Sequence, residues 1–361
     1  MRKIDFIVNH IDGFYCELID DDNHNDTYMV KFIDQSKGHV IYQSEMKPKT
    51  WVRLSRKYLS DILVEVYLKE ELVYNFRLYD YLKGKKIFIS FESKSLGDTL
   101  AWIPYCEKFR TIHGCEVIVS TFMNELFEER YPHIKFVGRG VVVSGISAML
   151  KLGWFYDKDK EPENPVTIPL QKTAPNILGL EYNGEELPRI AFKPSSKPVM
   201  TKYVCISTKS TSQMKEWYYW QELIDWLNAS GYKVIEVSKE DTPYKNLLKI
   251  KDKSLMNVMN YIHHAEYFIG LSSGLSWLSW ALKKPVVMIA NFTNKEHEFS
   301  NKCIRVVNES VCNSCWNNPM FMFNKGDWNY CPEHEDTPMQ FICHKSITAE
   351  IVINEIKKGG L

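Results

Sequence analysis

Residues 85–110 read KKIFISFESKSLGDTLAWIPYCEKFR, and the order of apolar and polar positions in this stretch decides the fold. Ile87 to Ser90 is typical of a short buried strand, and Asp98 to Arg110 has the pattern of a helix. Further strands are predicted at residues 117–120 and 134–137. Because strands that alternate with helices form parallel sheets, we expect an α/β fold from residue 85 onward.

The same alternation returns after residue 200 and predicts a second doubly wound unit. The proline-rich residues 138–200 between the two units are expected to be loops and a connection. The strands of the second unit are predicted at 204–207, 233–237, 267–270 and 285–289, and its helices at 217–230, 255–265 and 274–282.

The residues before 85 have a different pattern, with short β-branched stretches separated by polar turns. They predict a small β-rich domain that serves assembly or substrate docking. The expected division is therefore a β-rich domain at 1–84, Rossmann-like domains at 85–195 and 196–305, and a final lobe at 306–361.

Composition excludes several classes of protein. The 361 residues carry 45 basic and 45 acidic side chains, so neither nucleic-acid binding nor attraction to a membrane surface is expected. No apolar run is long enough to insert into a membrane, and the start does not resemble a signal peptide. Nine cysteines without a secretion signal argue for free or metal-bound thiols in the reducing cytoplasm.

Asp98 lies where a predicted strand leads into a helix, within Ser93-Lys94-Ser95-Leu96-Gly97-Asp98-Thr99. In doubly wound sheets ligands bind beyond the carboxyl ends of the strands, so a carboxylate at this point is a candidate general base. The alternative is a structural role, in which Asp98 is an N-cap that accepts backbone N–H bonds.

A second loop of small residues opens the helix predicted at 274–282. Backbone N–H groups and hydroxyls at a helix N-terminus suit phosphate oxygens, although an ordinary Ser-capped helix has the same sequence pattern. The candidate phosphate-binding residues are Ser273, Gly274, Leu275 and Ser276.

Residues 207–217 form a hydroxyl-rich loop with two lysines after another strand end. A departing diphosphate needs fixed donors and a cation, which favours Thr208 and Lys215 as ligands. Lys215 is preferred over Lys209 because it lies next to the helix start, while solvated loop lysines are the alternative. Glu240, beyond the next strand, is a candidate acceptor for ribose hydroxyls or else part of a solvated loop.

Four cysteines near the C-terminus have the spacing Cys312-x2-Cys315-x15-Cys331-x11-Cys343. Four thiolates at such spacing can complete a tetrahedral site for zinc or iron. Such a site leaves no open position, so its metal is expected to be structural, and no catalytic metal is predicted.

The lobe around these cysteines, residues 311–346, also holds two histidines. His334 and His344 exceed the need of a four-sulfur site and are predicted to have surface roles. The aromatic residues expected to supply the core of the lobe are Trp316, Phe321, Phe323, Trp328 and Tyr330.

The runs SLGDTLAWIPY (95–105) and SSGLSW (272–277), together with the four-cysteine lobe, resemble the bacterial autotransporter heptosyltransferases. These enzymes are relatives of the lipopolysaccharide heptosyltransferases. The resemblance extends from about residue 85 to the C-terminus and more weakly to the β-rich start. It implies a GT-B fold of two facing Rossmann-like domains, ADP-heptose as donor, and serine hydroxyls of an autotransporter adhesin as acceptors. It further implies one iron ion and a ring-like homo-oligomer such as a dodecamer.

Carried over by position, Asp98 matches the family's catalytic aspartate and the four cysteines match its metal ligands. Lys215 and residues 273–276 match positions expected at the diphosphate. Trp277 stands where the lipopolysaccharide enzymes commonly carry His, which favours the protein-modifying branch.

The sequence therefore predicts an inverting, metal-independent glycosyl transfer in which Asp98 takes the proton of an acceptor serine. Inversion comes from the resemblance alone. Because the cysteines lie far from Asp98 in sequence, their loss is expected to leave ADP binding at least partly intact. The alternatives are a non-enzymatic iron- or zinc-binding or electron-transfer protein, and a glycosyltransferase that uses another nucleotide sugar.

Overall fold

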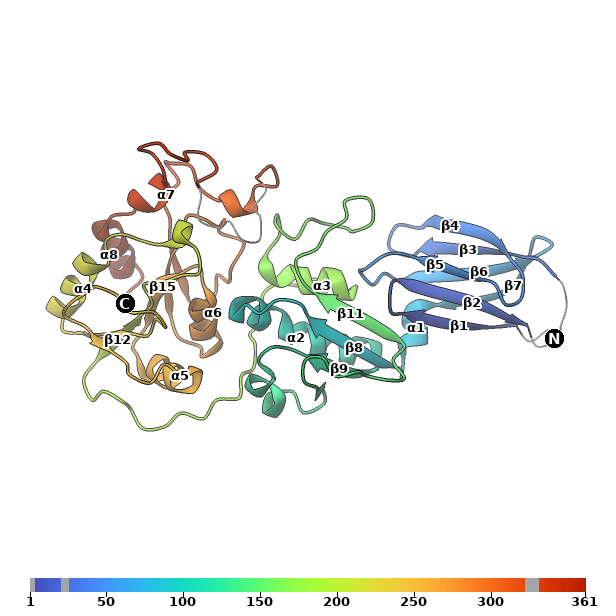
Figure 1. Ribbon diagram of the computed structural model, residues 1–361, viewed down its shortest axis with the longest axis horizontal. Coiled ribbons are helices and arrows are strands. Elements are labelled where there is room, and N and C mark those ends of the chain that lie inside the picture. The colour runs from blue at the N-terminus through green and yellow to red at the C-terminus, as the bar shows by residue number, and fades with distance from the viewer. Residues whose placement is uncertain (1–3, 21–25, 322–330) are drawn as a thin grey trace. The chain divides into compact units, whose positions relative to one another are not determined.

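The computed structural model describes residues 4–20, 26–321 and 331–361 (Figure 1). By their contacts the residues form two compact units. The first unit comprises Met1–Lys94, Trp102–Asn164 and Lys172–Gly184, and the second comprises Ser95–Ala101, Pro165–Gln171 and Glu185–Leu361. The four-domain division stays a prediction.

A seven-stranded sheet of order β10-β9-β8-β11-β1-β2-β5 runs through the first unit. Its parallel strands are β8 (Lys86–Phe91), β9 (Glu116–Ser120), β10 (Lys135–Phe136) and β11 (Ala148–Leu152), and its other strands are β1 (Ile4–His10), β2 (Phe14–Asp20) and β5 (Trp51–Leu54). The strands predicted after residue 85 are confirmed. The expectation of loops throughout 138–200 is wrong, because this region contains β11 and the helix α3 (Thr173–Leu178). The strand has only five residues and lies between Gly145 and Gly153, so its alternating burial at Ala148, Leu150 and Leu152 gave no clear strand pattern in the sequence.

The β-rich start of the chain is confirmed, and it contributes to two sheets. A four-stranded antiparallel sheet has the order β4-β3-β6-β7, while β1 continues the larger sheet by pairing with β11 at His10 and Ala148. The four strands are β3 (Tyr28–Asp34), β4 (His39–Met46), β6 (Ile62–Leu68) and β7 (Glu71–Arg77), and α1 (Leu78–Leu82) follows them. Edge contacts between Phe14 and Phe32 join the inner faces of the two sheets.

The second unit contains an all-parallel sheet of order β14-β13-β12-β15-β16-β17. Its strands are β12 (Tyr203–Ile206), β13 (Lys233–Glu236), β14 (Leu248–Lys249), β15 (Phe268–Leu271), β16 (Val286–Ile289) and β17 (Cys303–Val306). Its helices are α4 (Trp220–Ala229), α5 (Leu255–His264), α6 (Gly274–Ala281), α7 (Ile342–Lys345) and α8 (Ala349–Lys358). Helix α2 (Leu96–His113) begins in this unit, and its residues from Trp102 onward belong to the first unit. None of the helices in the described ranges is long and apolar enough to cross a membrane.

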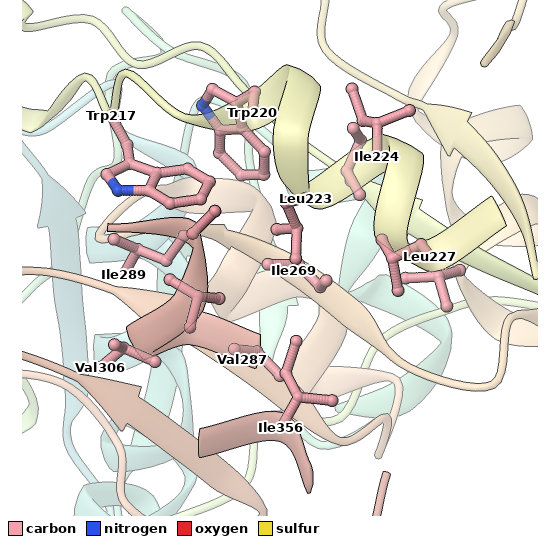
Figure 2. Close-up of a cluster of buried hydrophobic side chains, with 14 of the residues drawn as sticks. Trp217, Trp220, Leu223, Ile224, Leu227, Ile269, Val287, Ile289, Val306 and Ile356 are labelled. Carbon is pink, nitrogen blue, oxygen red and sulfur yellow. The ribbon is translucent and has the colours of Figure 1, made fainter. Parts of the chain in front are cut away.

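Helices α4 and α8 pack on one face of this parallel sheet (Figures 1 and 2). Leu223 of α4 lies next to Ile269 of β15, and Ile356 of α8 lies next to Val287 of β16 (Figure 2). Leu227 of α4 belongs to the same cluster. Trp217 is buried beside them and donates from Nε1 to the carbonyl oxygen of Ile347 at 2.6 Å. One face of the sheet is therefore covered in part by residues from the C-terminal end of the chain. The polar loops lie at the carboxyl ends of its strands.

Stability should fall in acid because His10 is buried on β1. Burial lowers the pKa of His10 to about 4, and its Nδ1 has no hydrogen-bond partner among the described residues. In the unfolded chain His10 is protonated below about pH 6.5, whereas in the folded protein it stays neutral until about pH 4. Because the unfolded state binds the extra proton, the free energy of unfolding decreases as the pH falls over that interval. A shift of this size corresponds to roughly 3 kcal/mol.

We expect His10→Leu to lose less stability than the wild type between pH 7 and pH 4.5, as measured by urea unfolding. His113 and His297, whose pKa values burial also lowers to about 4, act in the same direction and remain in both proteins. An equal loss of stability in the two proteins would show that His10 is protonated in the folded state.

Candidate active site

Asp98 lies in the first turn of α2 and is buried, with 8% of its surface exposed. Ser95 precedes the helix, and its Oγ accepts from the backbone N–H of Asp98 at 3.4 Å. The carbonyl oxygen of Ser95 accepts from Thr99 at 3.1 Å. Ser95 therefore takes the capping position, and the N-cap alternative for Asp98 is wrong.

The start of α2 touches the start of α6. A Cβ on Gly97 would lie 3.1 Å from Cδ1 of Trp277, and a Cβ on Gly274 would lie 3.0 Å from Cβ of Leu96. Neither position tolerates a larger residue without movement of its neighbour. Trp277 is held in turn by an edge contact with Phe299 at 5.0 Å. Asp98 is thus placed beside the small-residue loop that the sequence marked for phosphate.

That loop follows β15 and uses part of its polar groups internally. Ser276 is buried and donates from Oγ to the carbonyl oxygen of Leu271 at 2.6 Å, so its hydroxyl proton is occupied. Ser273 caps α6 with an extended backbone and makes no side-chain cap bond. The backbone N–H groups of Gly274 and Leu275 lie in the first helical turn, where N–H groups lack partners within the helix. They remain the best-placed donors for an anion.

A buried ion pair that the sequence analysis missed lies behind the loop. Arg305 of β17 contacts Glu298 at 2.6 Å, and Glu298 also accepts from the hydroxyls of Ser272 and Thr293. Burial opposes ionisation of Glu298, but Arg305, His297 and the hydrogen bonds hold its pKa at about 2. Glu298 is therefore a fixed anion at the carboxyl edge of the sheet.

Lys215 approaches this anion without pairing with it. Its Nζ lies 5.5 Å from the ring centroid of Phe292, and this ammonium group forms neither a hydrogen bond nor an ion pair with any residue that the structure describes. Burial lowers the pKa of Lys215, while the charges of Glu298 and Asp98 oppose that shift. Lys209, the rival lysine, pairs with Glu216 at 2.9 Å. Of the two lysines of this loop, Lys215 is thus the one whose ammonium group has no anionic partner among the described residues.

Thr208 lies in a separate cluster at the ends of β12 and β13. It is buried, and its Oγ1 donates to Glu236 at 3.1 Å. Ser238 adds its backbone N–H to the same carboxylate at 3.1 Å. Glu240 lies exposed just beyond this cluster, so the polar groups nearest the strand end are those of Glu236. No described contact joins Thr208 or Glu240 to Lys215 and Asp98.

The four cysteines influence one another electrostatically. Burial and then the neighbouring cysteines raise the pKa of Cys315 and that of Cys343 to about 12, and the pKa of Cys312 is also raised. Cys331 is buried and contributes to each of these shifts. Four cysteine sulfurs are a donor set that suits a soft cation. Among the described residues, however, no three His, Cys, Asp or Glu side chains converge closely enough to hold an ion.

The core of the lobe is described in part. Trp316 and Phe321 pack against Cys315 and Cys331, as predicted. The other three aromatic residues assigned to this core, Phe323, Trp328 and Tyr330, lie outside the described residues.

His344 contradicts its predicted surface role. It is 1% exposed, and its Nε2 accepts from the backbone N–H of Asn291 at 3.3 Å. Its Nδ1 lies 3.8 Å from Sγ of Cys343, and burial lowers the pKa of His344 to about 4. His334 is only partly buried, and no side-chain bond is recorded for it within the described ranges.

The missed residues left weak signals in the sequence. Arg305 stands in the strand-like run Cys303-Ile304-Arg305-Val306, where a buried arginine requires a buried anion. Its partner Glu298 follows the preceding strand, but nothing in the spacing marks it. His344 was discounted because a four-sulfur site needs no histidine.

The arrangement defines a class of protein. The helix start that carries Asp98 contacts the N-terminus of α6 beyond the carboxyl end of β15, and Lys215 has no anionic partner among the described residues. The chain also contains a second sheet with parallel α/β order. This is the organisation of a GT-B type glycosyltransferase, in which a nucleotide diphosphate binds at such an edge.

Comparison with known proteins identifies the family. The profile of glycosyltransferase family 9 (heptosyltransferase) matches residues 101–325. The autotransporter heptosyltransferase Aah of Escherichia coli is 32% identical over 353 residues, which cover 91% of this chain and 88% of Aah. The chain therefore belongs to glycosyltransferase family 9 and, within it, to the autotransporter heptosyltransferases. Asp98 itself lies just outside the matched range.

Two further relatives sharpen the comparison. The iron-containing dodecameric glycosyltransferase TibC from enterotoxigenic E. coli superposes with a TM-score of 0.85 at 28% identity, covering 98% of this chain and 95% of TibC. TibC has also been solved in complex with ADP-D-beta-D-heptose. A protein of Burkholderia thailandensis that is 31% identical over 324 residues, covering 85% of this chain and 76% of its own length, is named the inactive autotransporter heptosyltransferase BimC. Similarity at this level thus includes a protein that is named inactive.

Proposed function

We propose that this protein transfers heptose from ADP-heptose to serine hydroxyls of an autotransporter adhesin or a similar surface protein, with inversion. The observation that carries the proposal is that Lys215 is partly buried and has no anionic partner among the described residues. Burial lowers the pKa of this lysine, and the negative charge of Asp98 lies near enough to oppose that shift. The complex of TibC with ADP-D-beta-D-heptose supports the choice of donor.

The roles of the residues follow from the chemistry. Asp98 accepts the proton of the acceptor serine as the serine oxygen bonds to the anomeric carbon. The bond from that carbon to the diphosphate oxygen breaks, and ADP leaves with the electron pair. Lys215 and the backbone N–H groups at Gly274 and Leu275 stabilise the charge that develops on the diphosphate. Ser273, the N-cap residue of α6, makes no side-chain cap bond, so its hydroxyl can donate to the diphosphate. Ser276 stabilises the loop through its hydrogen bond to the carbonyl oxygen of Leu271.

The ribose and base would bind near the second polar cluster. Thr208 is positioned there by Glu236, and Glu240 lies within the loop that follows β13. A carboxylate beyond this strand can accept hydrogen bonds from both ribose hydroxyls.

The proposed cofactor is one iron ion, with zinc as the alternative, bound by Cys312, Cys315, Cys331 and Cys343. Iron-containing TibC supports iron. When bound, the ion supplies structural cross-linking of the lobe and leaves no position for substrate. Dodecameric TibC likewise supports a homo-oligomer as the working state. The proposed place of the reaction is the cytoplasm.

Intact-mass analysis of an autotransporter adhesin coexpressed with this protein tests the function. We expect increments of one heptose at serine residues, and each increment identifies the transferred sugar. Addition of ADP to the purified protein should raise its melting temperature, because a ligand that binds only the folded state stabilises it. Another mass increment would change the donor, and an unmodified adhesin together with no response to ADP would refute the proposal.

A further inference from the structure

The four-cysteine lobe is hydrogen-bonded to the segment that lies under Lys215. Ser314 donates its backbone N–H to the carbonyl oxygen of Asn291 at 2.6 Å, and Trp316 donates to that of Phe292 at 3.1 Å. The ring of Phe292 lies 5.5 Å from Nζ of Lys215. The lobe therefore fixes one wall of the surroundings of this lysine.

His344 makes a second connection on the other side. Its Nε2 accepts from the backbone N–H of Asn291 at 3.3 Å, next to Phe292 in sequence, and its Nδ1 lies 3.8 Å from Sγ of Cys343. Asn291 donates in return from Nδ2 to the carbonyl oxygen of Cys343 at 2.8 Å. One buried ring thus links the lobe to the segment of Asn291 and Phe292, whose ring faces Lys215.

Apolar packing reinforces both connections. Met214 and Phe292 belong to one buried cluster with Cys315, Cys331 and Phe341. Two of the expected metal ligands, Cys315 and Cys331, therefore pack with Met214 and Phe292. Met214 precedes Lys215 in sequence, and the ring of Phe292 lies near its Nζ.

We propose that the lobe positions Lys215 for the donor diphosphate, with His344 as the positioning residue and Phe292 as the wall. The inference rests on the proposed role of Lys215. A flexible ammonium stabilises developing charge best when the protein already holds it in place, because no reorganisation is then needed during the reaction. The metal would affect donor binding only through this protein framework and would touch no substrate.

The experiment uses His344→Phe in the full-length protein. This change removes the ring's hydrogen bonds and keeps an aromatic side chain in the same space. We expect the affinity for ADP, measured by calorimetry, to fall roughly tenfold, as is typical when a supporting hydrogen-bond partner is lost. Affinity for adenosine, which has no diphosphate, should stay within about twofold because only the surroundings of Lys215 change.

A double-variant cycle connects the effect to Lys215. Lys215→Ala should weaken ADP binding by roughly tenfold or more, since a charge-assisted contact is lost. In the Lys215→Ala background, His344→Phe should cause no further loss. Phe292→Leu provides a second variant that leaves His344 in place, and His334→Phe is the matched control at the other histidine of the lobe, with ADP affinity unchanged. Metal content per chain is measured for each protein.

The outcomes separate the two proposals. If Lys215→Ala leaves ADP binding intact, the proposed function of Lys215 fails. If Lys215→Ala weakens binding but His344→Phe weakens it equally in both backgrounds, or weakens adenosine and ADP alike, the positioning role is wrong. Should His344→Phe lose its metal or fail to fold, Phe292→Leu decides: normal ADP affinity in that variant overturns the inference.

Discussion

Asp98→Asn should reduce heptosyl transfer by roughly 10²- to 10⁴-fold, the range that general-base catalysis typically contributes. The amide keeps the size of the carboxylate but cannot accept a proton from the serine hydroxyl. Asp98 is buried in the first turn of α2, and the hydroxyl of Ser95 accepts from its backbone N–H, a bond that the amide variant keeps. The rate is measured by intact-mass analysis of the adhesin over time.

Binding measurements separate this effect from a loss of the site. ADP affinity of Asp98→Asn should be equal to or slightly higher than that of the wild type, because removal of a negative charge near Lys215 favours an anion. Asp12→Asn makes the same change at an exposed aspartate and should leave the transfer rate unchanged. Near-normal transfer by Asp98→Asn would remove Asp98 from the mechanism, whatever the family resemblance implies.

Part of this site could be predicted because parallel strands align their carboxyl ends. The apolar runs at 87–90 and 267–270 identified two strands, so the loops after them had to lie at sheet edges. The structure adds the contacts of Gly97 and Gly274 that bring the two helix starts together. The strands, the helices and the position of Asp98 could therefore be predicted from sequence patterns.

The remaining contacts join residues that no local pattern relates. Ser272 meets Glu298 across 26 positions, and Asn291 meets His344 across 53. Periodicity reports which face of an element is buried but not which polar side chains meet beneath it. The choice of Lys215 over Lys209 rested on nearness to a helix, whereas the physical distinction is the ion pair between Lys209 and Glu216.

The same reasoning revises what the cysteines are expected to do. Their distance from Asp98 in sequence suggested a lobe apart from the donor site, with ADP binding at least partly retained after metal loss. In space, Cys315 and Cys331 share a cluster with Met214 and Phe292. Loss of the metal should therefore disturb the residues that position Lys215. It should weaken ADP binding and lower the stability of the protein.

Cys331→Ser should abolish metal binding and destabilise the second unit by several kcal/mol. Structural zinc contributes on the order of 10 kcal/mol in small metal-dependent folds, and this binding energy is folding energy because the ligands are not assembled in the unfolded chain. Elemental analysis should find about one iron or zinc per wild-type chain and none in the variant. The melting temperature and the affinity for ADP should both fall.

Cys303→Ser is the matched control, since Cys303 lies on β17 in the same unit and outside the four-cysteine set. It should keep its metal, its affinity for ADP and most of its stability. Chelation of the wild-type protein should reproduce the Cys331→Ser phenotype, because both treatments remove the same cross-link and neither alters Asp98 or Lys215 directly. A metal-free protein with unchanged melting and normal ADP affinity would show that the four thiols are ordinary cysteines, and the lobe would then have to hold His344 and Phe292 in place by its apolar packing alone.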